Sequence, residues 1–279
     1  MSSSKRHIGR VLKFGSSVLR SPDDLPDVAA EVLRQLRAGV IPVVVVSAFR
    51  GRTDELHRIA EGVSPGSAAR SALLGVGELE AAAAVAVAIE RCGVSARLIE
   101  PEQVGITAAG EREESWPVRV EPEAIVSAVS CGEVSVVPGY IARGEDGSPH
   151  LLGRGGSDLT AISLGDTLRA EPVLIKGSGA VYEWDPKERG PKPRRFVEIG
   201  FDDALALGDR VLQARALEYA RAHQVPFVVT GLGGAAATRV IAGAGYAVLA
   251  DTDDRIEEQT ARRNRRASAA VTTNTGAQQ

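Results

Sequence analysis

The stretch Gly153-Arg154-Gly155-Gly156-Ser157-Asp158-Leu159-Thr160 leads from three glycines into an apolar run with helical character. We expect a helix to begin here, with Ser157 or Asp158 as its N-cap. A glycine-rich turn that enters a helix binds anions, because unpaired N–H groups and the helix dipole point toward the ligand. The stretch therefore predicts an anion-binding turn of the kind found in α/β proteins.

Short apolar runs alternate with amphipathic stretches along the rest of the chain. Buried strands are predicted at residues 11–14, 43–46, 134–137, 173–175 and 226–229. Apolar side chains recur at helical spacing over residues 25–36, 67–91 and 203–222, and Gly39 and Gly93 follow the first two as end signals. Alternating strands and helices predict an α/β fold with a mostly parallel sheet.

Charge and hydrophobicity argue against several classes of protein. Lys and Arg number 33 and Asp and Glu 36, a formal charge of −3 without the basic excess of nucleic-acid or membrane-surface proteins. The longest aliphatic run, Ala81 to Ile89, is nine residues long, against the roughly 20 that cross a bilayer. Cys92 and Cys131 have no C-x-x-C spacing, so we expect buried, reduced thiols in a cytoplasmic protein.

Polar and small residues follow the predicted strands. Lys13 lies near the end of the first strand, and Gly15 and Ser16 after it are small enough for a phosphate to reach the backbone N–H groups. Ser47 follows the second strand and opens a segment rich in hydroxyl groups. Ligands of open α/β sheets bind beyond the carboxyl ends of the strands. We therefore expect these residues to face the same pocket as Asp158.

The order of several motifs resembles the catalytic domain of aspartokinases in the amino-acid kinase superfamily. The motifs are Lys13-Phe14-Gly15, Val45-Val46-Ser47-Ala48, Thr53-Asp54-Glu55-Leu56, Gly77-Glu78-Leu79, Leu152-Gly153-Arg154-Gly155-Gly156-Ser157-Asp158 and Val181-Tyr182-Glu183-Trp184-Asp185-Pro186. The resemblance extends over about residues 9–245, and the motif at 152–158 is the most specific. It implies a three-layer αβα sandwich, with the amino acid held by the N-terminal half and ATP by the C-terminal half.

The resemblance also implies an activity, which is the ATP- and magnesium-dependent phosphorylation of the side-chain carboxylate of aspartate to an acyl phosphate. Lys13 and Asp158 are then catalytic: Lys13 neutralises the transferring phosphoryl group, and Asp158 organises the lysine and donor groups around it. The expected substrate-binding residues are Ser47, Thr53, Glu78, Arg154 and Ser157. Glu78 suits an ammonium group and Arg154 a carboxylate. The expected nucleotide-binding residues are Gly15, Ser16, Lys176, Gly177, Tyr182, Lys187 and Arg210.

Some positions depart from the aspartokinase pattern and leave alternatives open. The first loop is one residue shorter and resembles glutamate 5-kinase, so glutamate or another amino dicarboxylate is an alternative substrate. Lys176-Gly177 stands where aspartokinases have a Thr-Asp pair. Two alternatives are open for Lys176: it binds a phosphate group, or it lies solvated beside one. Arg210 replaces a lysine, and Ala108-Ala109 stand where an aspartate is usual. A binding subunit that has lost catalysis is the second alternative.

We expect one kinase domain over residues 1–252 and a disordered polar tail over residues 253–279. Regulatory ACT domains are not expected, so end-product lysine or threonine is not expected to inhibit. Family members commonly dimerise through this domain. The expected partners are therefore an amino acid, ATP and a second copy of the chain, without nucleic acid or membrane.

Overall fold

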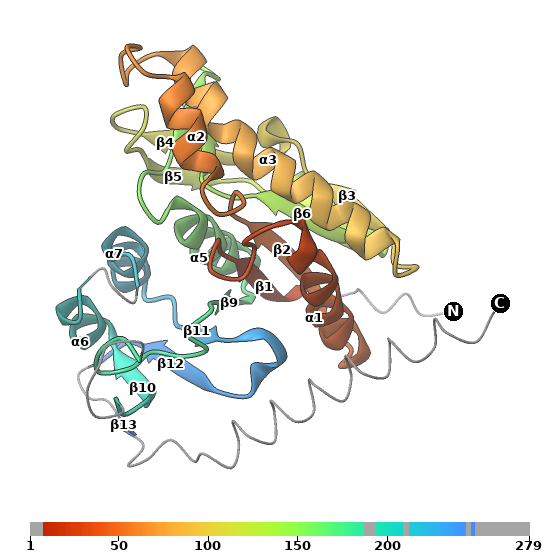
Figure 1. Cartoon of the computed structure of the whole chain (residues 1–279), viewed down its shortest axis with the longest axis vertical. Helices are drawn as coiled ribbons and strands as arrows, with labels where there is room; N and C mark the ends of the chain where they lie inside the picture. Colours follow the sequence, from red (N-terminus) through yellow and green to blue (C-terminus); the bar gives the residue numbers. More distant parts are fainter. Residues whose placement is uncertain (1–7, 187–192, 209–211, 244–246, 249–279) are drawn as a thin grey trace.

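A computed structural model describes residues 8–186, 193–208, 212–243 and 247–248. Within them a nine-stranded sheet has the order β13-β10-β12-β11-β9-β1-β2-β6-β3 (Figure 1). Its strands are β1 (Ile8–Phe14), β2 (Ile41–Val46), β3 (Ala96–Leu98), β6 (Val134–Pro138), β9 (Glu171–Ile175), β10 (Phe196–Gly200), β11 (Phe227–Thr230), β12 (Ala237–Ile241) and β13 (Ala247–Val248). Neighbouring strands are parallel except for the pairs β11 with β12 and β10 with β13, which confirms the predicted mostly parallel sheet.

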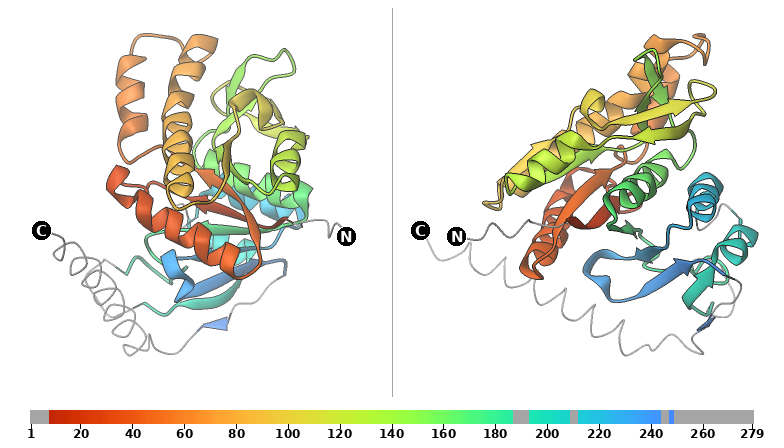
Figure 2. Two further views of the ribbon diagram at one scale, coloured as in Figure 1. Left: turned by 90° about the vertical axis from the view of Figure 1, so that its right-hand side faces the viewer. Right: turned by 180° about the vertical axis from the view of Figure 1, so that it is seen from behind.

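Helices cover both faces of this sheet. In β2, Val43 and Val45 pack into the core that contains α4 (Glu123–Ser130), α5 (Gly156–Leu168), α6 (Phe201–Ala206) and α7 (Ala214–His223). Val44 and Val46 point the other way, into the core that contains α1 (Leu25–Arg37) and α3 (Ala68–Glu90). Figure 2 shows α1 and α5 on opposite sides of β1 and β2. Every residue of β2 except the partly buried Ile41 is therefore covered, and the predicted three-layer αβα sandwich is confirmed.

A second, smaller sheet lies beyond the central one and was not predicted. It has the order β5-β4-β7-β8. Its strands are β4 (Ile106–Ala109), β5 (Trp116–Val120), β7 (Ile141–Arg143) and β8 (Pro149–Leu151). Together with α2 (Arg52–Ile59) and the first half of α3 it forms the upper part of the molecule in Figure 1. Short 3₁₀ turns complete the described elements at Pro22–Asp24, Pro101–Gln103 and Leu232–Gly234.

Helix α3 is long and apolar enough to cross a membrane by length and composition alone, with a mean hydropathy of 1.8 over its best window. Half of that window is buried inside the protein. Leu74, Ala81, Val85 and Ile89 are fully buried, and the helix packs against β6 and β3. Burial of apolar side chains against a sheet explains this composition, so α3 is a core helix.

Two expectations about the fold are wrong. The stretch 203–222 forms α6 and part of α7 rather than one helix, because Gly208 follows α6 in the left-handed conformation with φ of +74°. Cys92 and Cys131 are exposed rather than buried. Each follows the last turn of a helix, α3 for Cys92 and α4 for Cys131, where the chain turns away from the core.

Candidate active site

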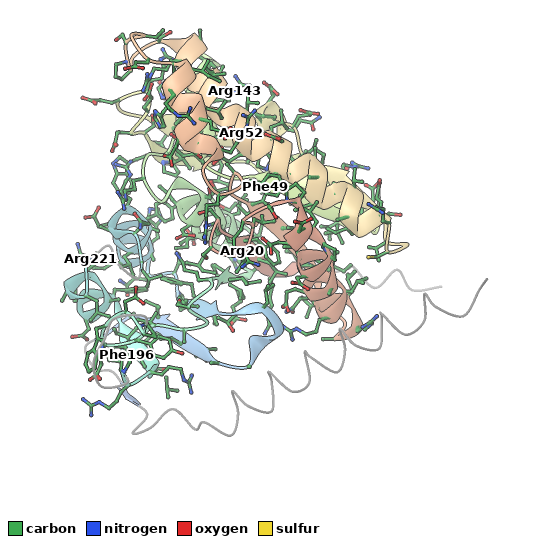
Figure 3. The ribbon with its side chains drawn as sticks, viewed as in Figure 1. Arg20, Phe49, Arg52, Arg143, Phe196 and Arg221 are labelled. Atoms are coloured by element: carbon green, nitrogen blue, oxygen red, sulfur yellow. The ribbon has the colours of Figure 1, made fainter. Side chains whose placement is uncertain are left out.

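A cleft of about 1550 Å³ lies at the carboxyl ends of β1, β2 and β9, between the central sheet and the smaller one. Its lining includes these expected site residues: Lys13, Gly15, Ser16, Ser47, Thr53, Glu78, Arg154, Ser157, Asp158, Lys176, Gly177 and Tyr182. Lys187 and Arg210 lie outside the described residues. Arg20 and Phe49, labelled in Figure 3, also line the cleft. The fold thus brings together expected site residues that are up to 169 positions apart, from Lys13 to Tyr182.

One buried carboxylate joins two lysines in this cleft. Asp158 Oδ1 lies 2.7 Å from Lys13 Nζ, and Asp158 Oδ2 lies 2.7 Å from Lys176 Nζ. The three side chains are only 3%, 8% and 17% exposed for Asp158, Lys13 and Lys176. Lys176 is therefore paired and mostly buried, which does not fit the solvated alternative.

Burial and charge act in opposite directions on these groups. Burial alone would raise the pKa of Asp158, but the two ammonium groups outweigh it and hold that pKa well below its usual value. Burial lowers the pKa of Lys13, and the attraction of Asp158 offsets only part of that effect. Since Asp158 stays ionised, it fixes two positive groups at the floor of the cleft.

The local backbone explains how these groups meet. Lys13 follows Leu12 on β1, next to Leu174 of β9, and Lys176 comes directly after β9. Helix α5 packs against β1, and it begins at Gly156 after Gly155 in the left-handed conformation, so neither Ser157 nor Asp158 is its N-cap as expected. Both lie in the first turn instead, where the helix dipole favours a carboxylate.

The turn after β1 is tight and contacts the loop after β9. The Gly15 carbonyl accepts hydrogen bonds from the N–H groups of Val18 and Leu19. A β-carbon on Gly15 would lie 2.9 Å from Lys13 Nζ, so a larger residue here would have to displace the ammonium group from its place over this turn. The N–H groups of Ser16 and Ser17 have no acceptor within the described part of the chain. An anion bound here would meet these donors beside the two lysines.

Glu78 is the second buried acid of the cleft and has a different environment. It is 4% exposed, and Ala48 N–H donates to its Oε1 over 3.4 Å. Its Oε2 is buried without a hydrogen-bond partner among the described residues. Burial raises the pKa of Glu78 to about 8, although Lys13 nearby lowers it somewhat. Such an orphaned oxygen can accept a hydrogen bond from a cationic ligand.

The remaining expected substrate-binding residues line the same cleft as Glu78. Arg154 is exposed, and its Nε donates to Gln213 Oε1 over 2.9 Å at the N-cap of α7. Ser157 is buried beside Gly139, where a β-carbon would lie 2.6 Å from Ser157 Cβ. Ser47 and Thr53 are half-buried and also line the cleft. The arrangement offers one guanidinium fork and three hydroxyl groups around a neutral acid.

Several residues that were not predicted as site residues also line the cleft, among them Arg50, Trp184 and Tyr140. Arg50 lies in the loop after β2, Trp184 belongs to the motif that contains Tyr182, and Tyr140 follows β6. Tyr140 has a left-handed φ of +69°, which is uncommon for a residue other than glycine. Arg50 and Tyr140 come soon after predicted strands, so position along the chain could have identified them, but side-chain type did not.

Among the residues that the structure describes, no three His, Cys, Asp or Glu side chains gather to hold a metal ion. Asp158, the acid on the cleft floor, already serves two ammonium groups. A magnesium ion commonly keeps several waters and takes other ligands from substrate phosphates. The residues present therefore fit a magnesium ion that is bound by the phosphates of a nucleotide.

Comparisons with known proteins identify the family of the chain. The model of the amino acid kinase family matches residues 10–231. The aspartokinase of Corynebacterium glutamicum is 34% identical over 226 residues, which are 78% of this chain and 53% of that protein. This chain spans about half the length of the curated relatives that it matches.

Solved structures give the same result. The crystal structure of aspartate kinase from Synechocystis has a TM-score of 0.68 and 30% identity, and the match covers 85% of this chain and 40% of that one. Aspartokinase III of E. coli, solved with aspartate and ADP, has a TM-score of 0.72 at 22% identity over 85% of this chain and 65% of that one, which supports the fold alone. The resemblance drawn from the motifs is confirmed, and the chain belongs to the amino acid kinase family.

Proposed function

We propose that this domain transfers the γ-phosphoryl group of ATP to the side-chain carboxylate of aspartate and forms an acyl phosphate. The observation that carries the proposal is the pair of lysines held by Asp158 at 2.7 Å each, beside the Gly15 turn. Phosphoryl transfer needs positive groups and donors that are fixed before the reaction, and little covalent chemistry from the protein. The aspartokinase names of the relatives support the choice of substrate.

In this proposal the described residues position the two substrates and neutralise the negative charge of the phosphoryl group. The substrate carboxylate is ionised at neutral pH and attacks without a base. Its oxygen forms a bond to the γ-phosphorus while the bond to the β,γ-bridging oxygen breaks, and ADP leaves with that electron pair. Lys13 and Lys176 balance charge on the phosphoryl oxygens, and the N–H groups of Ser16 and Ser17 donate to them. Magnesium, when bound on the nucleotide, supplies further positive charge.

Recognition of an α-amino acid needs an acceptor for the ammonium group and a cation for the carboxylate. The Oε2 atom of Glu78, which has no partner among the described residues, can accept a hydrogen bond from the ammonium group, and the guanidinium group of Arg154 can bind the α-carboxylate. Ser47, Thr53 and Ser157 supply hydroxyl donors to the remaining carboxylate oxygens. The nucleotide lies on the other side of Lys176, along Gly177 and Tyr182. Lys187 and Arg210 remain expected nucleotide contacts, and a cytoplasmic homodimer the expected state.

Trapping the product with hydroxylamine tests the proposed function. The protein is incubated with ATP, magnesium and either aspartate, glutamate or an analogue, and hydroxamate is measured. We expect the highest kcat/KM with aspartate. A preference for glutamate or another amino dicarboxylate would select that substrate instead, and no hydroxamate from folded protein with any acid would contradict catalysis. Size-exclusion chromatography with light scattering tests the dimer.

We expect the affinity for aspartate to depend on the ionisation of Glu78. Below its pKa of about 8 the carboxyl group is protonated and offers no charge to the ammonium group. The KM for aspartate is therefore expected to fall as the pH rises through about 8. Glu78→Gln should raise this KM and remove that part of its pH dependence. If the profile of the variant equals that of the wild type, Glu78 is not the ammonium site.

We expect Arg154→Ala to change the KM for aspartate but not the KM for ATP. Loss of a charge-assisted hydrogen bond to a carboxylate should raise the KM for aspartate by roughly 10–10²-fold. The KM for ATP should change little, because Arg154 lies on the amino-acid side of the lysine pair. Steady-state kinetics with each substrate varied in turn measure both values. Equal damage to both would place Arg154 at the nucleotide rather than at the amino acid.

A further inference from the structure

Arg50 ties the loop after β2 to the turn after β1. Its backbone N–H donates to the Leu19 carbonyl over 3.2 Å, and its Nε donates to the Ser16 carbonyl over 3.3 Å. Ser47 N–H donates to the Phe14 carbonyl over 3.0 Å in the same pair of loops. These bonds hold the guanidinium group of Arg50 next to the turn whose free N–H groups face the cleft.

The guanidinium group of Arg50 keeps most of its donors free. The side chain is exposed and lines the cleft, and its two Nη atoms have no partner among the described residues. The neighbouring arginines differ: Arg20 is paired with Asp24, and Arg52 is paired with Glu55 and Glu80 at 2.9 Å each. Arg20 and Arg52 are labelled in Figure 3, on either side of Phe49. Of these three arginines, only Arg50 lines the cleft without an ion pair to a carboxylate among the described residues.

The net positive charge at the cleft floor is small, so a further cationic group such as the Arg50 guanidinium would help to neutralise a bound phosphoryl group. Lys13 and Lys176 carry two positive charges, and Asp158 cancels one of them. Glu78 adds little negative charge at neutral pH. A phosphoryl group in transfer spreads its negative charge over three oxygens. A planar guanidinium group can bond two of those oxygens at once, which an ammonium group cannot do with the same geometry.

We propose that Arg50 contacts the transferring phosphoryl group through its Nη donors and stabilises it in the transition state, as a catalytic residue. The proposal rests on the proposed function. The oxygen–phosphorus bond to the acceptor carboxylate forms as the bond to ADP breaks, and the electron pair stays on the β-phosphate of ADP. Arg50 keeps its protons throughout and supplies only charge and hydrogen bonds.

Arg50→Ala and Arg52→Ala form a matched pair of variants for the test. Arg50 lies in the loop after β2, and Arg52 is the first residue of α2, two positions later. Arg52 does not line the cleft. We expect Arg50→Ala to lower kcat by about 10²–10³-fold, with a small change in the KM for aspartate. Arg52→Ala should keep the wild-type kcat. Guanidinium ion at a non-denaturing concentration should raise kcat of Arg50→Ala, which a purely structural residue would not show.

Binding of ADP with aluminium fluoride, an analogue of the transferring phosphoryl group, gives a second measurement by calorimetry. Arg50→Ala should weaken this binding far more than binding of ADP alone. Equal kcat values for the two variants, or equal losses in both binding experiments, would overturn the proposal for Arg50. If wild-type protein forms no hydroxamate, the proposed function fails separately, and the fluoride experiment alone decides on Arg50.

Discussion

Lys13→Ala is expected to lower kcat by about 10²–10³-fold or more, because it removes one of two fixed cations from the site of phosphoryl transfer. Lys13 is buried and its ammonium group lies over the Gly15 turn, so bulk water cannot replace it well. Hydroxamate formation under saturating aspartate and ATP measures the effect. Circular dichroism and thermal unfolding show whether the variant is folded.

Arg10→Ala is the control for this prediction. Arg10 is on the same strand, at its other end, and pairs with Glu171. Its loss should leave kcat close to that of the wild type. Lys13→Met, which keeps the volume of the side chain without the charge, should lose as much activity as Lys13→Ala. An active Lys13→Met protein would remove the charge of Lys13 from the mechanism.

Asp158→Asn is expected to lower the free energy of unfolding by about 3–5 kcal/mol, because it leaves two buried ammonium groups without their counter-charge. Asp158 is only 2% exposed, so little water can compensate for the lost charge. Urea unfolding at neutral pH measures the loss. Asp166→Asn is the control, because Asp166 is on the same helix and is only half-buried beside His223. Equal stability of the two variants would contradict the role of Asp158.

The stability of Asp158→Asn should also depend on pH in a set direction. Burial already lowers the pKa of Lys13 below its ordinary value of 10.5, and loss of the carboxylate lowers it further. The folded state then binds fewer protons than the unfolded state, so stability rises with pH toward that value. The gap between variant and wild type should narrow at alkaline pH. A constant gap would mean that Lys13 stays charged without Asp158.

The central sheet could be predicted because its strands are continuous apolar runs. Val43 to Val46 are buried, with their side chains on both faces of the sheet. Short continuous apolar runs of this kind are typical of strands in parallel sheets that are covered on both faces. The smaller sheet could not be predicted. Its β7 and β8 have three residues each, and β5 starts with Trp116-Pro117 and includes Arg119. Their pairing depends on long-range packing, which local sequence does not reveal.

The candidate site was only partly predictable, for a similar reason. Lys13 and Asp158 were found because small residues follow or precede them in motifs, and Glu78 was found only through the resemblance to aspartokinases. The sequence does not reveal that Asp158 holds Lys176, because that contact depends on how α5 meets the loop after β9. Tyr140 was missed because a left-handed tyrosine has no sequence signal. The sequence does not distinguish Arg50 from a solvated surface arginine, because its hydrogen bond to the Ser16 carbonyl depends on how the two loops meet.

The sharing of Asp158 by two lysines has a consequence for protein engineering and for evolution. A change at any one of the three positions alters the electrostatic balance of the other two, so the effects of combined substitutions will not add. Double-mutant cycles should therefore give large coupling energies within the trio. A designer who grafts this chemistry onto another scaffold has to transplant all three side chains together, and natural drift at one position requires compensation at another.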